Sequence, residues 1–373
     1  MPESDRLVSH VQTRLDDFLT AQAAGLREIS PDLTPVQEFS ADLLRGGKRF
    51  RAQFCYWGWR SVIDLEPSPV GRPPGEERPG YRAVVGVAAG LEVFHAAALV
   101  HDDIIDRSDT RRGRPAAHRR FEALHASRGW GGSSAGFGEA GAILLGDLLL
   151  GWSDELLIDS LLALADGSAA RATRAELATM RTQVTLGQYL DVLEEVAWPT
   201  VDEDETLARA HNVVVYKSAK YSIEAPLVVG ASLAGASPEQ VAALRAVGLP
   251  LGIAFQLRDD VLGVFGDSAV TGKPSGDDLR EGKRTVLVAL ARRRLPDGVR
   301  RTVDALLGDP DLDDEQIRVL QSILRESGAL DEVEGMIARN VRESLAALRD
   351  APIAARARNQ LELLVDTVTR RVT

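Results

Sequence analysis

The sequence predicts an all-α protein, a single domain over residues 1–373 with roughly a dozen helices around a central cavity. Apolar residues recur at helical spacing along most of the chain, and no stretch alternates apolar and polar residues as a strand would. Only 5% of the residues are aromatic, while alanine and leucine are abundant, which favours helix over sheet. No change in composition marks a linker between two domains.

The amino-terminal elements follow from apolar spacing and from helix end signals. Residues 5–28 are expected to form the first helix. Thr34 is expected to cap a second helix, with Pro35 at its first position, and Gly46-Gly47 should end it. Residues 66–80 are rich in proline and glycine and should form a surface loop.

The glycine-rich residues 128–138 are expected to be flexible, either as a lid or simply as a mobile loop. Helices are expected on both sides of this segment and through the rest of the chain. The apolar spacing predicts them over residues 83–100, 119–125, 142–164 (as one buried helix), 174–196, 211–225, 238–265 and, in several pieces divided by prolines, 285–372.

Bulk composition excludes several classes of protein. The formal net charge is −11, so nucleic acid is an improbable partner. The only cysteine, Cys55, allows neither an internal disulfide framework nor a cysteine metal site, and this fits a cytoplasmic protein. The amino terminus lacks a signal pattern, and no apolar run of membrane-spanning length is free of charge, so no stable membrane insertion is expected.

The first acidic motif ends the apolar run 83–100. On a helix Asp102 and Asp106 share a face, with Asp103 beside them. Three carboxylates within one turn repel one another and need a counter-charge, which Mg²⁺ supplies because it prefers oxygen ligands. The arginines Arg111-Arg112 follow closely, and this pattern suits a metal-bound phosphate better than a bare metal.

A second acidic pair, Asp259 and Asp260, lies near the end of the helix 238–265. The basic, glycine-punctuated segment 271–285 follows it. Two such helix ends that face each other across one cavity would hold several Mg²⁺ ions on one diphosphate.

A basic segment precedes both acidic motifs. Lys48 is expected to begin a third helix, so that Lys48 and Arg51 share a face. Taken alone, Lys48 and Arg51 would be interpreted as a surface charge pair. His95 would be interpreted as a histidine of the core, and the aspartates as a solvated helix end.

Together these motifs resemble those of the trans-isoprenyl diphosphate synthases, also called polyprenyl synthetases. The matching segments occur in family order and are GGKRFR at 46–51, DDIID at 102–106 with RRGRP at 111–115, the Lys-Ser pair at 217–218, FQLRDD at 255–260 with Gly266-Asp267, and GDDLREGK at 276–283. The resemblance implies the isoprenoid synthase type I fold and a head-to-tail chain elongation. An allylic diphosphate ionises, the double bond of isopentenyl diphosphate attacks the carbocation, and loss of a proton leaves a product five carbons longer.

The resemblance also implies a role for each matching residue, with three Mg²⁺ ions on the bound diphosphate. The metal ligands would be Asp102, Asp106 and Asp259, supported by Asp103 and Asp260. Isopentenyl diphosphate would be bound by Lys48, Arg51, His95 and Arg112, and the allylic diphosphate by Arg111, Lys217 and Lys273. The catalytic residues near the cation would be Lys217, Ser218 and Gln256. One departure stands out, because many members carry a third acid in the second motif where this chain has Gly263.

Product length depends on the residues that precede Asp102 on its helix. Ala97 and Ala98 are small and would not block a growing tail. Phe94 is one turn deeper, about 5.4 Å along the axis. We expect Phe94 to form the floor, which gives geranylgeranyl diphosphate. If Phe94 merely packs in the core, the floor lies elsewhere and a longer polyprenyl product results; a farnesyl product is a further alternative.

Two other functions compete with elongation. Terpene cyclases and head-to-head synthases share the fold and the metal chemistry, but generally lack the sites for a second diphosphate. A regulatory subunit would tend to lose acids from its motifs, and both pairs are intact here. The resemblance further suggests a homodimer, with helix 5–28 or 142–164 at its interface.

Overall fold

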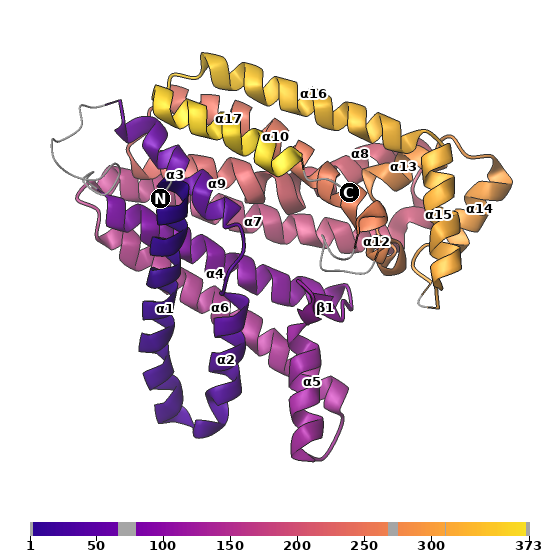
Figure 1. Ribbon diagram of the computed structural model, residues 1–373, viewed down its shortest axis with the longest axis horizontal. Helices are drawn as coiled ribbons and strands as arrows, with labels where there is room; N and C mark the ends of the chain where they lie inside the picture. Colours follow the sequence, from indigo (N-terminus) through magenta and orange to yellow (C-terminus); the bar gives the residue numbers. More distant parts are fainter. Residues whose placement is uncertain (1–2, 66–79, 268–274, 310, 371–373) are drawn as a thin grey trace.

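The computed structural model describes residues 3–65, 80–267, 275–309 and 311–370 (Figure 1). Helices form nearly all of this part of the chain, which confirms the all-α class. The helices of the first half are α1 (Glu3–Ile29), η1 (Pro31–Leu33), α2 (Thr34–Leu43), α3 (Phe50–Ile63), α4 (Tyr81–Ile105), α5 (Ala117–Arg128), α6 (Ser134–Leu162), α7 (Gly167–Ala197) and η2 (Trp198–Thr200). Those of the second half are α8 (Glu203–Val213), the π-helix η3 (Val214–Glu224), α9 (Ala225–Leu233), α10 (Pro238–Phe265), α12 (Asp277–Glu281), α13 (Val286–Arg292), α14 (Asp297–Leu306), α15 (Asp314–Glu326), α16 (Ala329–Asp350) and α17 (Ala355–Thr369).

Helix α4 is the centre of the bundle. It packs along α6 and also contacts α3 and α1, while α10 packs between η3 and α16 (Figure 1). Both α4 and α10 are long and apolar enough to cross a membrane, but 83% of the most apolar stretch of α4 and 50% of that of α10 are buried inside the protein. These apolar helices therefore form the core of this fold.

The crossing of α3 and α9 brings two backbones into contact at glycines. A Cβ added at Gly230 would lie 2.7 Å from the carbonyl carbon of Cys55 and 2.8 Å from the amide nitrogen of Trp59. A Cβ at Gly58 would lie 2.9 Å from the carbonyl carbon of Leu227. Because real Cβ atoms do not approach so closely, both positions require glycine for the two helices to cross at this distance.

One short antiparallel ribbon interrupts the helices, and the sequence analysis predicted no strand. Its strands β1 (Thr110–Arg111) and β2 (Arg114–Pro115) pair Thr110 with Pro115. The turn between them has positive φ angles at Arg112 (53°) and Gly113 (71°), as a tight hairpin turn requires. Two-residue strands are too short to show alternation in a sequence, so this element escaped prediction.

Several predicted helix limits are wrong at the amino-terminal side. Thr34 is the first residue of α2 and not its cap, because Ser30 caps the preceding turn and η1 leads directly into α2. Lys48 lies in the loop before α3, which begins at Phe50, so Lys48 and Arg51 do not share a helical face. The predicted loop 66–80 lies outside the described residues except for Gly80.

The glycine-rich segment 128–138 was expected to be flexible, but residue 128 ends α5 and residues 134–138 belong to α6. Helix α6 begins at Ser134, and the Ser133 hydroxyl caps it by accepting a hydrogen bond from the Gly136 amide at 3.1 Å. Nor is α6 buried throughout, as was predicted for 142–164, since Leu144 and Leu162 are 68% and 78% exposed. The predicted helix 211–225 is divided where α8 passes into the π-helix η3.

Candidate active site

The first acidic motif lies at the carboxyl end of α4, where basic side chains hold it. Arg111 of β1 donates to Asp103 through Nε at 2.7 Å and contacts Asp102 through Nη2 at 3.3 Å. Lys217 lies 3.1 Å from the other oxygen of Asp102. Burial opposes the ionisation of Asp102, but Lys217, Lys283 and Arg111 outweigh it and hold the pKa of Asp102 well below its usual value. Asp102 is therefore a carboxylate at neutral pH.

Asp106 lies deeper and is paired with a lysine from a distant part of the chain. Its side chain is fully buried, and Lys283 lies 2.6 Å from Oδ2. Lys283 also contacts Glu281 at 2.8 Å, and Ser108 donates a hydrogen bond to Glu281. These contacts join the end of α4 to the segment that follows α12.

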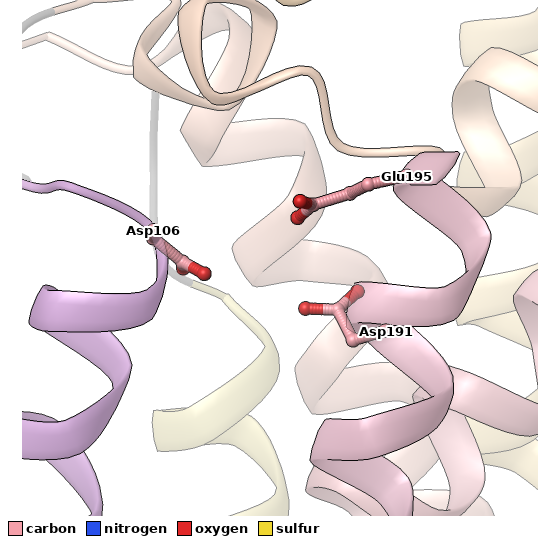
Figure 2. A group of neighbouring side chains, drawn as sticks. All are labelled: Asp106, Asp191 and Glu195. Atoms are coloured by element: carbon pink, nitrogen blue, oxygen red, sulfur yellow. The ribbon is translucent and has the colours of Figure 1, made fainter.

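Helix α7 adds two acids to this cluster. Oxygen atoms of Asp106, Asp191 and Glu195 all lie within 4.8 Å of one another, and the three side chains converge in Figure 2. Asp191 also pairs with Lys217 at 2.5 Å. Burial and the charges of Asp191 and Asp106 raise the pKa of Glu195 to about 7.

The donor set fits Mg²⁺. The buried oxygens Oδ1 of Asp102 and Oδ2 of Asp106 lie 3.1 Å and 2.6 Å from the ammonium groups of Lys217 and Lys283. Hard carboxylate oxygens gathered in this way suit a small divalent cation. The residues that could hold such ions here are Asp102, Asp106 and Asp191 on one side and Asp259 and Asp260 on the other.

The second acidic pair faces the same cavity, whose volume is about 750 Å³. Gln256 donates to Asp260 at 2.7 Å, one turn along α10. Burial, together with the charge of Asp278, raises the pKa of Asp260 to about 8. The predicted residues that line this cavity are Lys48, Arg51, His95, Asp102, Arg111, Arg112, Lys217, Ser218, Gln256, Asp259 and Asp260.

The π-helix η3 brings Lys217 and Ser218 to this cavity. A π-helix carries one more residue per turn than an α-helix, and such segments are frequent at functional sites. Burial would lower the pKa of Lys217, but Asp102 and Asp191 hold it above its usual value. Lys217 is thus a permanent cation between α4 and α7.

A second basic group lies around Tyr221 of η3. The guanidinium of Arg51 lies 4.3 Å from the ring centroid of Tyr221 and donates to the Ser222 hydroxyl at 2.8 Å. His95 Nδ1 is 3.1 Å from the Tyr221 hydroxyl. Burial and the nearby arginines, Arg51 and Arg112 first among them, hold the pKa of His95 well below its usual value. His95 is therefore neutral.

Arg49 is a further cation near His95, although the sequence analysis assigned it no role. It is buried, adopts a left-handed backbone with φ 52°, and pairs with Glu92 of α4 at 3.0 Å. It also donates to Gln12 of α1 at 2.8 Å. Arg49 thereby anchors the loop that carries Lys48.

The amino-acid sequence matches the family model described as polyprenyl synthetase over residues 34–324. The chain belongs to the polyprenyl synthetase family. It is a trans-prenyltransferase, a polyprenyl diphosphate synthase that condenses isopentenyl diphosphate with an allylic diphosphate.

Named relatives of this polyprenyl synthetase differ in their products. It is 36% identical to a geranylfarnesyl diphosphate synthase from Aeropyrum pernix over 88% of this chain and 91% of the relative. It is 30% identical to a nonaprenyl diphosphate synthase from Mycobacterium tuberculosis over 95% of this chain and 94% of the relative. A geranylgeranyl pyrophosphate synthase from Corynebacterium glutamicum, solved with isoprenyl diphosphate and magnesium, superposes with a TM-score of 0.89, 38% identity and full coverage of both chains.

Not every predicted residue of the polyprenyl synthetase lies at the cavity. Lys273 falls outside the described residues. Asp103 lines a smaller neighbouring cavity of about 210 Å³, together with Arg111 and Arg112. Asp106 lies buried behind Lys283 and reaches the site through that ion pair.

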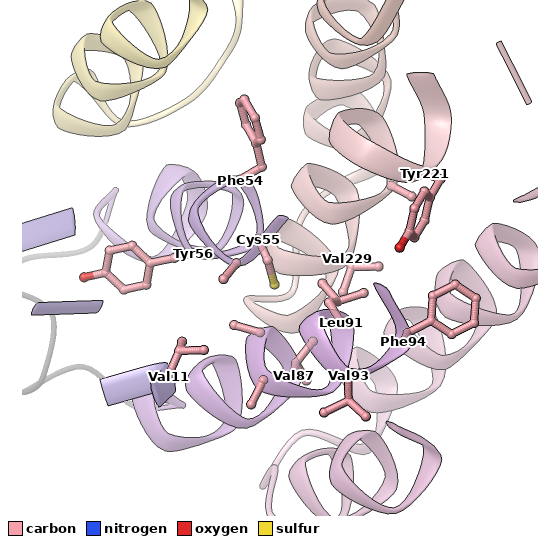
Figure 3. Close-up of a cluster of buried hydrophobic side chains, with 14 of the residues drawn as sticks. Val11, Phe54, Cys55, Tyr56, Val87, Leu91, Val93, Phe94, Tyr221 and Val229 are labelled. Atoms are coloured by element: carbon pink, nitrogen blue, oxygen red, sulfur yellow. The ribbon is translucent and has the colours of Figure 1, made fainter. Parts of the chain in front are cut away.

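The three residues predicted to set chain length do not line the cavity. All three, Phe94, Ala97 and Ala98, lie on α4. Phe94 is buried, with its ring 5.7 Å from that of Tyr221, and Arg181 of α7 lies 5.6 Å from the Phe94 centroid (Figure 3).

The sequence analysis gave no individual role to four charged residues of the site: Asp191, Glu195, Asp278 and Lys283. The sequence analysis includes Asp278 and Lys283 only within the GDDLREGK motif, and it assigns no role to Asp191 or Glu195. A signal was present for Asp191, since a carboxylate on the buried face of an apolar helix needs a partner. No local pattern marks Glu195, which becomes notable only because α7 packs near Asp106.

Proposed function

We propose that this polyprenyl diphosphate synthase makes geranylgeranyl diphosphate, using three Mg²⁺ ions held by its two acidic motifs. The observation that carries the proposal is that both acidic groups and both basic groups converge on one cavity. Such a cavity binds two diphosphates, one beside the metals and one beside the arginines, as a condensation of two diphosphate esters requires.

On this proposal each of the two basic groups binds the diphosphate of one substrate. Lys217 and Arg111 bind the diphosphate of the allylic substrate, because both lie against Asp102. Lys48, Arg51 and Arg112 bind isopentenyl diphosphate, with His95 as a neutral donor. If the Tyr221 hydroxyl donates to His95 Nδ1, the imidazole carries its own proton on Nε2, where it can donate to a phosphate oxygen.

The leaving diphosphate gains negative charge as the allylic bond breaks. Bound Mg²⁺ would supply Lewis-acid stabilisation of that charge. Lys217 and Arg111 add fixed positive charge at the same place, and these contacts strengthen in the transition state. Ser218 and Gln256 lie at the cavity, where their dipoles face the carbocation, and Gln256 also orients Asp260.

We propose the product length from the residues of α4 that precede Asp102. Ala97 and Ala98 precede Asp102 on α4, and Phe94 lies one turn further back. None of the three lines the cavity as it stands, so on this proposal a growing tail opens a path along α4 that ends at Phe94. Phe94 is clamped between Tyr221 and Arg181, which supports a rigid floor one turn below the alanines. This floor suits a tail of twenty carbons.

We further propose a cytoplasmic homodimer. Exposed apolar side chains cluster on two neighbouring helices and are Leu144, Ile158 and Leu162 on α6 and Leu186, Tyr189 and Val196 on α7. An apolar face of this extent is typical of a permanent interface. This face supports α6, which contains residues 142–162 of the predicted segment 142–164, over α1 as the interface helix.

The decisive experiment supplies the purified protein with Mg²⁺ and isopentenyl diphosphate and, in separate reactions, dimethylallyl, geranyl or farnesyl diphosphate. Products are sized by chromatography and mass spectrometry. A single twenty-carbon product is expected. A ladder beyond twenty-five carbons would contradict the Phe94 floor, and failure to consume isopentenyl diphosphate with any primer would contradict the division of substrates proposed here.

A further inference from the structure

A smaller cavity adjoins the active-site cavity and has a volume of about 210 Å³. The two cavities share His95, Arg111 and Arg112. Much of the wall of the smaller cavity comes from α2, from the β1–β2 ribbon and from the first residues of α5. Helices α2 and α5 contribute no residue to the larger cavity, and neither Lys48 nor Arg51 lines the smaller one. The smaller cavity is therefore a separate place, although the two meet at Arg112.

Basic side chains outnumber acidic ones around the smaller cavity. Among the described residues, six arginines and three carboxylates line it, namely Arg45, Arg49, Arg111, Arg112, Arg114 and Arg120, and Asp42, Glu92 and Asp103. Because His95 is neutral, the lining carries an excess of three positive charges, in a chain whose formal net charge is −11. Such a local excess attracts a multivalent anion.

Each of the three carboxylates is already engaged with an arginine of the lining. The contacts of Glu92 and Asp103 are described above. The third carboxylate, Asp42, lies 2.8 Å from Arg120 and 3.3 Å from Arg45, so two cations share it. The acids of the cavity are therefore not available to neutralise its remaining arginines.

The excess charge lies on Arg112 and Arg114. Neither guanidinium forms an ion pair within the part of the chain that the structure describes. Arg112 occupies the turn of the ribbon, where burial and the charges of neighbouring arginines lower its pKa against the opposing charge of Glu92. A guanidinium offers forked donors that match two oxygens of one phosphate group. An anion between these arginines would supply the missing negative charge.

The amino terminus of α5 adds backbone donors to these arginines. Ala116 and Ala117 line the smaller cavity, and Ala116 precedes the helix without a side-chain oxygen that could cap it. The first amide groups of α5 carry the positive end of the helix dipole, which favours a phosphate group. Helix α5 also carries Arg120, whose guanidinium lies 3.9 Å from the ring centroid of Phe39 and is thereby held at the cavity.

We propose that the smaller cavity is a second anion site, which binds inorganic diphosphate between Arg112, Arg114 and Arg120. Its volume is less than a third of the roughly 750 Å³ of the larger cavity, so it suits a compact anion without a hydrocarbon tail. The three excess positive charges match inorganic diphosphate better than inorganic phosphate, because diphosphate carries the larger negative charge.

Occupation of this site would act on substrate binding through Arg112. The same guanidinium is proposed above to bind isopentenyl diphosphate in the larger cavity, and it cannot serve both anions fully at once. Inorganic diphosphate, which the condensation releases, would therefore weaken the binding of isopentenyl diphosphate, and isopentenyl diphosphate would weaken that of inorganic diphosphate by the same factor. This effect on the reaction rests on the proposed function, whereas the anion site does not.

The test removes charges that belong to the smaller cavity alone. The variants are Arg114→Gln and Arg120→Gln, and neither residue lines the larger cavity. Arg349→Gln is the matched control, because Arg349 is exposed on α16 and lines neither cavity. Lys48→Gln is the reciprocal control for the larger cavity. Far-ultraviolet circular dichroism and the melting temperature show whether each variant folds, and Arg114→Gln should be as stable as the wild type because Arg114 is exposed.

Binding is measured by titration calorimetry with inorganic diphosphate in the presence of EDTA, so that no magnesium recruits the anion to the acidic motifs. The wild type should bind the anion at two sites. Arg114→Gln and Arg120→Gln should each weaken one of these sites roughly 10-fold. Lys48→Gln should weaken the other site, and Arg349→Gln should weaken neither. Wild-type crystals soaked in the same anion should show density between Arg112, Arg114 and Arg120.

Steady-state kinetics test the link through Arg112. At constant free magnesium, added inorganic diphosphate should raise the KM for isopentenyl diphosphate less in Arg114→Gln than in the wild type. Without added inorganic diphosphate the two proteins should have the same KM. A higher KM in Arg114→Gln under that condition would overturn the proposal, because the smaller cavity would then belong to the substrate site.

Two binding results would also overturn the proposal. One is wild-type affinity for inorganic diphosphate in both Arg114→Gln and Arg120→Gln, and the other is anion density confined to the surroundings of Lys48 and Arg51. Elongation is assayed separately in the wild type. Failure of the proposed function would appear there as unconsumed isopentenyl diphosphate, which leaves the calorimetric test of the anion site unaffected.

Discussion

Asp102 forms ion pairs with basic residues from two other elements of the site. It faces Arg111 from β1 and Lys217 from η3, and its pKa is held well below its usual value by these cations against the effect of burial. An isosteric amide in its place would keep the shape but lose the charge.

Asp102→Asn should therefore lower kcat by about 10²- to 10³-fold or more, since the proposed metal ligand and the partner of two cations are removed together. Steady-state kinetics with isopentenyl and geranyl diphosphate measure the effect. Asp109→Asn is the control, because Asp109 is 62% exposed and pairs with Arg119 outside the cavity. Equal kcat values for the two variants would contradict the role of Asp102.

His95 makes stability depend on pH. The fold lowers the pKa of His95 well below its usual 6.5 through burial and the charges of Arg51, Arg112, Arg111 and Arg49. Below pH 6.5 the unfolded chain takes up a proton that the folded protein does not, so this contribution is complete above pH 6.5 and is lost as the pH falls. The loss is at most about 1.4 kcal/mol per pH unit.

His95→Gln should consequently show a flatter decline in the free energy of unfolding between pH 6.5 and 5. Urea unfolding at pH 7.5, 6.5 and 5.5 measures the difference from the wild type. Parallel declines in the two proteins would mean that His95 is protonated in the folded state.

At the scale of elements, the α3–α9 crossing is the tightest helix contact described above. Gly230→Ala must push the helices apart and should cost about 1–3 kcal/mol. Gly25→Ala on α1 is the matched control, because a Cβ there meets nothing within 4 Å and should stabilise by roughly 0.5–1 kcal/mol. Chemical denaturation of both variants compares them, and a neutral Gly230→Ala would show that the crossing can relax.

The proposed floor of the tail path is a second property of elements, because Phe94 of α4 packs against Tyr221 of η3 and Arg181 of α7. Phe94→Ala should lengthen the product and destabilise the protein by about 3–5 kcal/mol. Phe54→Ala is the control, since Phe54 is equally buried on α3 and points away from Phe94 (Figure 3). It should lose comparable stability with no change in product length, and an unchanged product from Phe94→Ala would place the floor on another helix.

The limits of sequence-based prediction are clearest for individual elements. Helix α10 was predicted at its observed limits, 238–265, from apolar spacing. In the structure a capping box at Ser237 and Pro238 in the first turn fix its start. The start of α6 was missed because its first residues are rich in glycine, which suggests flexibility when packing is unknown. Tertiary structure also determines the conformation of Lys48, since the loop before α3 is held by Arg49 through Glu92.

At the scale of the whole molecule, the proposed homodimer would form through the exposed apolar residues of α6 and α7. Leu144→Glu should shift the protein from dimer to monomer, because a carboxylate is costly to bury in an apolar interface. Light scattering after size exclusion measures the mass. Leu363→Glu on α17 is the control, as Leu363 is 61% exposed on another helix. A dimer that persists with Leu144→Glu would place the interface elsewhere.

The candidate site is likewise a property of the whole chain. The motifs at Asp102 and Asp259 are visible in the sequence because each is local. Their meeting with Asp191 and Lys283 is not, because these residues lie on different helices and approach only through the packing of α4, α7 and α10. The family resemblance identified the chemistry, whereas the acids beyond the motifs needed coordinates.

The lysine–aspartate pairs of the cavity also make it respond to two ions at once. If these aspartates hold magnesium as proposed, magnesium alone would have to displace Lys283 from Asp106 and Lys217 from Asp102, and diphosphate alone would have to draw the same lysines away from their carboxylates. When both arrive, each ion takes the partner that the other releases. By thermodynamic reciprocity each must tighten the binding of the other by the same factor. On the proposed function, the cavity would therefore bind a diphosphate ester together with its metal more tightly than either one alone.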